Sequence, residues 1–212
     1  MGAVGREPEV AWDFAGPADA GPLGAAIIGY RDMGGVGLDL RVAGTAAITV
    51  VIELGGREVI VDDAVGRRNL GGFVVGLPVE PMRIRSERAE CIEVRLSPIR
   101  AYSLLGVAPT DLGRGAVDLD ELWGPRARRL REQLAAARTW DERFALTKSF
   151  LAQCDRPMRT PDPEVLAGWH HILASHGQVK IGALADSVGW SHKRLRRTSP
   201  DRTRCTMRLG SA

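Results

Sequence analysis

Apolar and polar positions alternate along much of the chain between residues 25 and 98, which is the pattern of half-buried β-strands. In residues 91–96 the side chains of Ile92, Val94 and Leu96 share one face of such a strand. Glycine pairs separate the alternating runs, and the pattern predicts strands over residues 36–42, 46–54, 59–61, 73–76, 82–86 and 91–96. Short strands at this spacing are typical of a small barrel or sandwich.

The alternation stops on either side of this region. Residues 1–24 are rich in Gly, Pro and Ala without any period, so we expect a poorly ordered leader. Residues 100–105 predict a short helix, and residues 118–123 a connector. Two longer helices are predicted over 126–138 and 139–154, and a Thr-x-x-Glu capping box opens the second. The chain therefore changes from β-rich to helical near its middle.

The segment 181–197 has the layout of a helix-turn-helix. A preceding helix is predicted from Asp162-Pro163, because proline is tolerated in the first turn of a helix. Gly189 can take the left-handed conformation that ends one helix, and the Ser191 side chain can cap the next. That next helix exposes the polar and basic residues Ser191, His192, Lys193, Arg194, Arg196 and Arg197. A cationic helix after a tight turn suits the major groove of DNA, so these six residues are the predicted DNA contacts.

Charge is uneven along the chain. The whole chain of 212 residues carries a net charge of only +3, but residues 190–212 hold seven Lys or Arg against one acid, Asp201. A basic end on a near-neutral body indicates a polyanionic partner, although a solvated basic tail is the plain alternative. Three widely spaced cysteines without a CxxC motif indicate reduced thiols, and neither a signal peptide nor a membrane span is apparent. These features predict a soluble, cytoplasmic protein.

No catalytic constellation is apparent in the sequence. His170, His171 and His176 lack the i, i+4 spacing that places two metal ligands on one helix face. The acidic groups Asp62-Asp63 and Asp118/Asp120/Glu121 are interpreted as solvated loops, and residues 34–37 as a turn. We therefore expect neither a metal, a cofactor nor an enzymatic activity.

The order and the residue patterns of several segments resemble those of the AraC family of bacterial transcriptional regulators, in particular members with a cupin-like N-terminal domain. Residues 47–56, 94–109, 117–122 and 181–197 carry the resemblance. It implies an α+β fold: a small cupin-like β-barrel, a helical linker and a three-helix unit with the helix-turn-helix. The implied bounds are 25–122 for a sensing or dimerisation domain, 123–157 for the linker and 160–212 for the DNA-binding domain. Promoter DNA, a small-molecule effector and a second copy of the chain are the implied partners.

The sequence departs from the family pattern after Arg197. An aromatic core residue, a Gly-x-x-Pro turn and a second helix-turn-helix are expected there, but the chain has Ser199, Pro200 and an Arg-rich run to Ala212. This departure is interpreted as a truncation or frameshift. Loss of one of two groove contacts is expected to weaken DNA binding by roughly 10³.

Two other functions are considered. The chain could be a ligand-binding or dimerisation module whose DNA-binding end is vestigial. A cupin enzyme is disfavoured, because cupin metal sites use histidines in the barrel and all four histidines lie at residue 170 or beyond.

Overall fold

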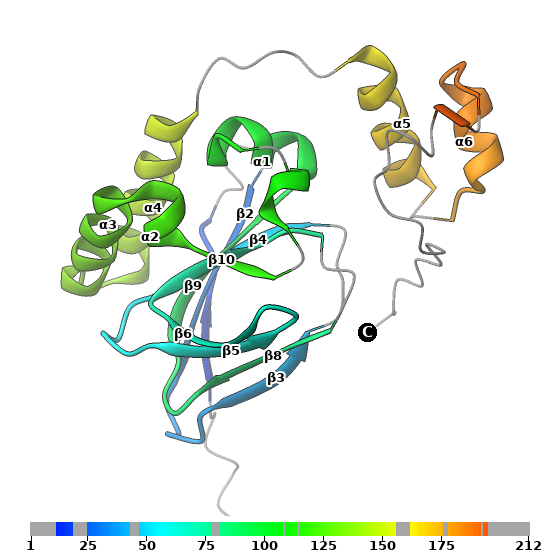
Figure 1. Ribbon diagram of the computed structural model, residues 1–212. Helices are drawn as coiled ribbons and strands as arrows, with labels where there is room; N and C mark the ends of the chain where they lie inside the picture. The colour runs from blue at the N-terminus through cyan, green and yellow to red at the C-terminus, as the bar shows by residue number, and fades with distance from the viewer. Residues whose placement is uncertain are drawn as a thin grey trace, which may run out of the picture. The chain divides into compact units, whose positions relative to one another are not determined.

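The computed structural model describes residues 12–18, 25–42, 47–77, 81–107, 109–113, 115–155, 162–175, 178–191 and 193–194. The chain divides into two compact units, Met1–Pro157 and Met158–Ala212. The first unit is a β-sandwich with helices, and the second contributes two described helices (Figure 1).

Two antiparallel sheets form the first unit. The larger has six strands in the order β1-β2-β9-β4-β7-β10, and the smaller has four in the order β3-β8-β5-β6. The strands of the larger sheet are β1 Trp12–Ala15, β2 Ala25–Asp32, β4 Ile48–Glu53, β7 Gly72–Val75, β9 Glu90–Leu96 and β10 Ala116–Asp118. Those of the smaller are β3 Leu38–Val42, β5 Val59–Asp63, β6 Gly66–Leu70 and β8 Met82–Ser86.

All six predicted strands are present, but the expectation of a poorly ordered leader is wrong for residues 12–15. β1 lies within residues 1–24 and pairs with β2, placing Phe14 opposite Tyr30. The four-residue run is too short to show a period by itself, and it is ordered by its partner strand. Residues 1–11 and 19–24 of the predicted leader lie outside the described residues. β2, β6 and β10 were not among the predicted strands.

The larger sheet has an apolar cluster on each face. One face, which includes Val50, Val74 and Val94, packs against the helices of the first unit. The other face, which includes Phe73 and Cys91, packs against the smaller sheet. Alternation along the strands explains the division, because successive side chains point to opposite faces. The central strands are therefore apolar on both sides.

Four α-helices follow β9 in the first unit, and β10 lies between the first and second of them. They are α1 Pro98–Leu105, α2 Leu119–Trp123, α3 Pro125–Ala136 and α4 Trp140–Cys154, with a 3₁₀ turn, η1, at Pro109–Leu112. The predicted capping box is present, since Thr139 Oγ1 accepts a hydrogen bond from Glu142 N at 3.2 Å. The predicted connector at 118–123 is wrong: α2 begins there, with Asp118 as its N-cap. The cap carboxylate accepts a hydrogen bond from Asp120 N at 2.8 Å.

Trp140 joins α4 to the larger sheet. Its ring lies against β2 so closely that a Cβ added to Gly29 would be 2.6 Å from two ring carbons. The indole N–H donates to Asp13 Oδ2 at 2.9 Å, and the guanidinium carbons of Arg31 and Arg143 lie 5.3 and 4.9 Å from the ring centroid. Glu90 accepts from both arginines, at 2.7 and 2.6 Å. Asp13, Arg31 and Arg143 thus hold the indole in place.

The second unit contains α5 Pro163–Ala174 and α6 Ile181–Ser187 among its described residues. The α+β class is confirmed, with two antiparallel sheets and six α-helices in the described part. A three-helix unit is not confirmed, since only Lys193 and Arg194 of the predicted third helix are described. Residues 195–212, where the sequence departs from the AraC pattern, lie outside the described residues. No helix in the described part is long and apolar enough to cross a membrane.

Candidate nucleic-acid interface

The two helices of the second unit meet at a glycine. A Cβ placed on Gly168 in α5 would lie 3.6 Å from Val188 Cγ1 and 3.8 Å from Leu184 Cδ1, which are ordinary contact distances. Ala185 on the same side of α6 is fully buried. Leu184, Ala185 and Val188 therefore form the inner side of this pair, as the sequence predicts.

A left-handed glycine ends α6. Gly189 has φ of +66°, a conformation that side chains with a Cβ rarely adopt. The N–H of Trp190 donates to Ala185 O at 2.9 Å, which closes the turn at the end of the helix. Trp190 is then turned into the unit and buried, and its indole N–H has no partner in the described residues.

Ser191 caps the residues that follow this turn. Its Oγ accepts a hydrogen bond from Arg194 N at 3.2 Å, the Ncap-to-N3 pattern of a helix start. Lys193 and Arg194 are both helical and exposed. The Arg194 guanidinium carbon lies 4.7 Å from the Trp190 ring centroid, so a cation–π contact orients this side chain.

Three of the six predicted DNA-contact residues are brought together here: Ser191, Lys193 and Arg194. His192, Arg196 and Arg197 lie outside the described residues, as do His176 and Cys205. The three described residues follow a closed turn and carry two cations on an exposed helical start. Their contact with DNA stays a prediction.

The interior between the two sheets is apolar. Phe73, Val61 and Met82 are among the buried side chains that fill it, and Tyr30 packs at its edge. Burial raises the pKa of the Cys91 thiol to about 12 and also raises the pKa of Tyr30. Neither group titrates near neutral pH, and both serve packing. No group of three or more metal-ligating side chains occurs in the described residues.

The interpretation of Asp62-Asp63 as a solvated loop is wrong. Both residues end β5, and the Asp63 carboxylate is almost fully buried. It accepts hydrogen bonds from Ala116 N and Val65 N, each at 2.8 Å, and from Arg68 Nη2 at 2.9 Å. Burial raises the pKa of Asp63, but these donors outweigh it and hold the pKa below its ordinary value. Asp63 thereby ties the β5–β6 hairpin to β10.

The second acidic group also has structural partners. Asp120 forms two hydrogen bonds with Arg131 of α3, at 2.9 and 3.0 Å. The Arg131 hydrogen bonds are the main reason that the pKa of Asp120 is lowered.

The predicted turn at 34–37 is confirmed, and its amides at Gly35, Val36 and Gly37 donate to the buried Asp32 carboxylate.

Comparisons with known proteins give similarities in fold only. Neither a family model nor a curated protein sequence matches the chain. Among solved structures, the AraC-like transcriptional activator CuxR is 14% identical, with a TM-score of 0.40, covering 90% of this chain and 81% of that chain. The cadmium form of PhpD complexed with hydroethylphosphonate is 13% identical, with a TM-score of 0.30, covering 91% of this chain and 49% of that chain. 2-Hydroxyethylphosphonate dioxygenase is also 13% identical, at a TM-score of 0.28 and with 47% of that chain covered.

The expectation that the chain is not an enzyme needs correction. The chains similar to it include dioxygenases as well as a transcriptional activator. This chain spans about half the length of the dioxygenases that it matches.

Proposed function

We propose that this chain is a DNA-binding transcriptional regulator of the AraC type. Residues 181–197 would contact promoter DNA through Ser191, His192, Lys193, Arg194, Arg196 and Arg197. The observation that carries the proposal is the capped turn: the left-handed Gly189 followed by a Ser191 hydroxyl that accepts from Arg194 N. In an unstructured basic tail, we would not expect a serine hydroxyl to cap the residues that begin the basic run.

The capped turn places Lys193 and Arg194 in the first turn of the second helix of the motif. In helix-turn-helix proteins the first turn of the second helix meets base edges, and basic residues further along contact phosphates. Lys193 and Arg194 are exposed at that position, and Arg194 is held over the Trp190 ring. Because the ring restricts its rotamers, Arg194 loses less conformational entropy on binding than a free arginine. Lys and Arg in this place favour guanine.

The test first selects, from a random-sequence duplex pool, the duplex that the full chain binds best. Fluorescence anisotropy then measures binding of the chain to this enriched duplex and to its scrambled version. Lys193→Gln and Arg194→Gln are expected to weaken binding by about 1–3 kcal/mol each if they meet bases. Each lost phosphate contact would instead reduce the slope of log affinity against log salt by about 1. Arg129→Gln, on the exposed side of α3, is the charge-matched control and is expected to change neither value.

Ser191→Ala separates the proposal from a solvated basic tail. The substitution leaves the charge unchanged but removes the cap, which is worth about 1 kcal/mol to a helix. Weaker binding by this variant supports the capped reader. The proposal fails if Ser191→Ala binds like the parent chain and the enriched duplex is bound no better than the scrambled one.

A further inference from the structure

The solvent-facing side of the smaller sheet has a cavity at one end. Its volume is about 280 Å³, and it is lined by Val36, Gly37, Leu38, Asp39, Ile60, Arg85, Ser86 and Glu87. The strand register places Asp39 of β3 and Ile60 of β5 on either side of Arg85 in β8. Three residues far apart in sequence thus form one row across the sheet.

Arg85 in this row makes no hydrogen bond in the described part of the chain. Asp39 lies directly opposite, but both of its carboxylate oxygens accept from Arg83, at 2.8 and 2.6 Å. Arg85 forms a long ion pair with Asp62 of β5, in which Arg85 Nη2 lies 4.0 Å from Asp62 Oδ2. The Arg85 side chain is only 29% exposed, and its Nε is buried without a partner. A partly exposed guanidinium with one long ion pair and no hydrogen bond gains free energy when a ligand supplies an acceptor.

Two further features define what the cavity could hold. Val36 and Ile60 supply apolar walls. The side chain of Leu38 packs against the inter-sheet cluster, and Ser86, its partner in the strand register, lies on that same face. The Asp39 and Glu87 carboxylates in the lining oppose more than one negative charge on a ligand. The volume lies at the lower end of the range for small-molecule sites. These properties together favour a small, singly charged anion with an apolar part.

We propose that this cavity binds a small organic monocarboxylate, held by its carboxylate on the Arg85 guanidinium and by its apolar part against Val36 and Ile60. Arg85 would supply paired N–H donors to the two carboxylate oxygens. The site lies entirely in the first unit, so it does not depend on DNA binding by the second. A ligand here would bridge the edge strand β3 to β8 and β5.

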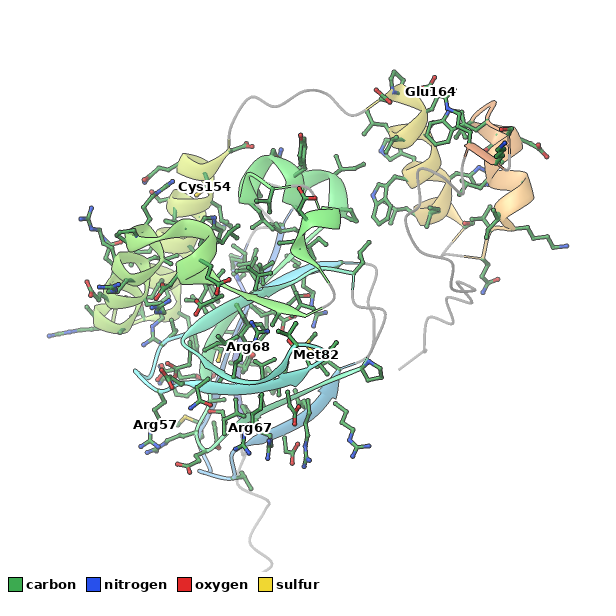
Figure 2. All side chains as sticks on the ribbon, viewed as in Figure 1. Arg57, Arg67, Arg68, Met82, Cys154 and Glu164 are labelled. Carbon is green, nitrogen blue, oxygen red and sulfur yellow. The ribbon has the colours of Figure 1, made fainter. Side chains whose placement is uncertain are left out.

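Neighbouring arginines show that Arg85 is distinctive. Arg67, in β6 of the same sheet, faces solvent and does not line the cavity. The next residue, Arg68, points to the interior and donates to Ala116 O at 2.6 Å (both arginines are labelled in Figure 2). Arg67 is therefore a matched control for the charge of Arg85 without its place in the cavity.

The experiment is an amide NMR titration of the full chain with butyrate, with the neutral isostere butyramide, and with the dianion succinate. Butyrate is expected to shift the amides of Val36, Gly37 and Glu87, with a dissociation constant in the millimolar range for so small a ligand. Butyramide and succinate are expected to bind at least about tenfold more weakly. Arg85→Gln should lose butyrate binding by roughly tenfold or more, and Arg67→Gln should stay within about twofold of the parent.

A second variant protects the test against misfolding. Val36 is 72% exposed, so Val36→Asp should fold, and its added charge should repel the carboxylate. Val65→Asp, at a residue 67% exposed and outside the lining, is its control. The proposal is overturned if butyramide shifts the same amides as strongly as butyrate. It is equally overturned if butyrate leaves these amides unmoved, or if Val36→Asp binds it as well as Val65→Asp does.

Discussion

The two units of this chain differ in how much apolar surface their described residues bury. In the first unit, both faces of the larger sheet are covered, and side chains such as Phe73 and Val50 are fully buried. In the second unit only Gly168, Ala185 and Trp190 are buried among the described residues. Hydrophobic burial is the main favourable contribution to folding. The first unit can therefore supply its own stability, whereas the described helices of the second gain little from packing.

The exposed apolar side chains of the second unit also indicate sparse packing. Leu173 and Ile181 are each about half exposed, at 53% and 50%. Segments with few buried apolar contacts open with low free energy, whatever the stability of the rest of the chain. We therefore expect amides in α6 to exchange with solvent faster than those in β4 and β9. Comparable exchange in both units would contradict this contrast.

The largest expected effect comes from the core of the first unit. Phe73→Ala should lower its free energy of unfolding by about 3–5 kcal/mol, because the substitution removes a fully buried ring and leaves a cavity. Phe14→Ala, at a residue 69% exposed, is the matched control and should cost far less. Urea denaturation followed by circular dichroism measures both. Equal losses would mean that the inter-sheet cluster is not the stabilising core.

A smaller effect is expected at the buried carboxylate that joins β5 to β10. Asp63→Asn should cost about 2–4 kcal/mol at neutral pH, since Arg68 loses its charged partner. The folded pKa of Asp63 lies below its unfolded value, so this stabilisation is present above about pH 4 and is lost as the pH falls through the folded pKa. The difference between parent and variant should therefore shrink in acid. Denaturation at a series of pH values measures this.

The adjacent residue provides the control for that measurement. Asp62 is half exposed and lies 4.0 Å from Arg85, so Asp62→Asn should change stability by less than about 1 kcal/mol. A loss at Asp62 as large as that at Asp63 would show that charge alone, and not the buried hydrogen bonds, accounts for the effect.

The smallest expected effect tests whether the two units fold independently. Gly189→Ala should cost about 1–2 kcal/mol, because φ of +66° is strained for a residue with a Cβ. Gly56→Ala, at φ of +70° in the first unit and with open space around it, should cost about the same. Hydrogen exchange resolved by segment should show each loss confined to its own unit. Losses that spread into the other unit would show that the two fold together.

Local signals explain which elements could be predicted from the sequence. The bounds of β8 match the prediction, and the Gly189 turn and Ser191 cap depend on residues within a few positions of each other. β6 was missed because its sequence, GRRNL, has little apolar character. The inward Arg68 of this strand donates to Asp63 and to the Ala116 carbonyl, 48 residues away in sequence. Such a partner becomes evident only once the strands are paired.

The two candidate sites also differ in how far they can be predicted from the sequence. The basic segment after Gly189 is contiguous in sequence, so charge and turn chemistry were enough to predict it. The cavity at Arg85 requires the register of β3, β8 and β5 together. Nothing in the sequence distinguishes Arg85 from Arg83, whose hydrogen bonds to Asp39 leave Arg85 without that partner.

The contact between Gly29 and Trp140 restricts how this sequence can vary over evolution. Any side chain at position 29 would collide with an indole that Asp13 and two guanidinium groups hold in place. A substitution there is tolerable only after the residue at 140 has become smaller, and the reverse order leaves a gap. Among homologues we therefore expect these two positions to change together, with glycine retained wherever tryptophan is.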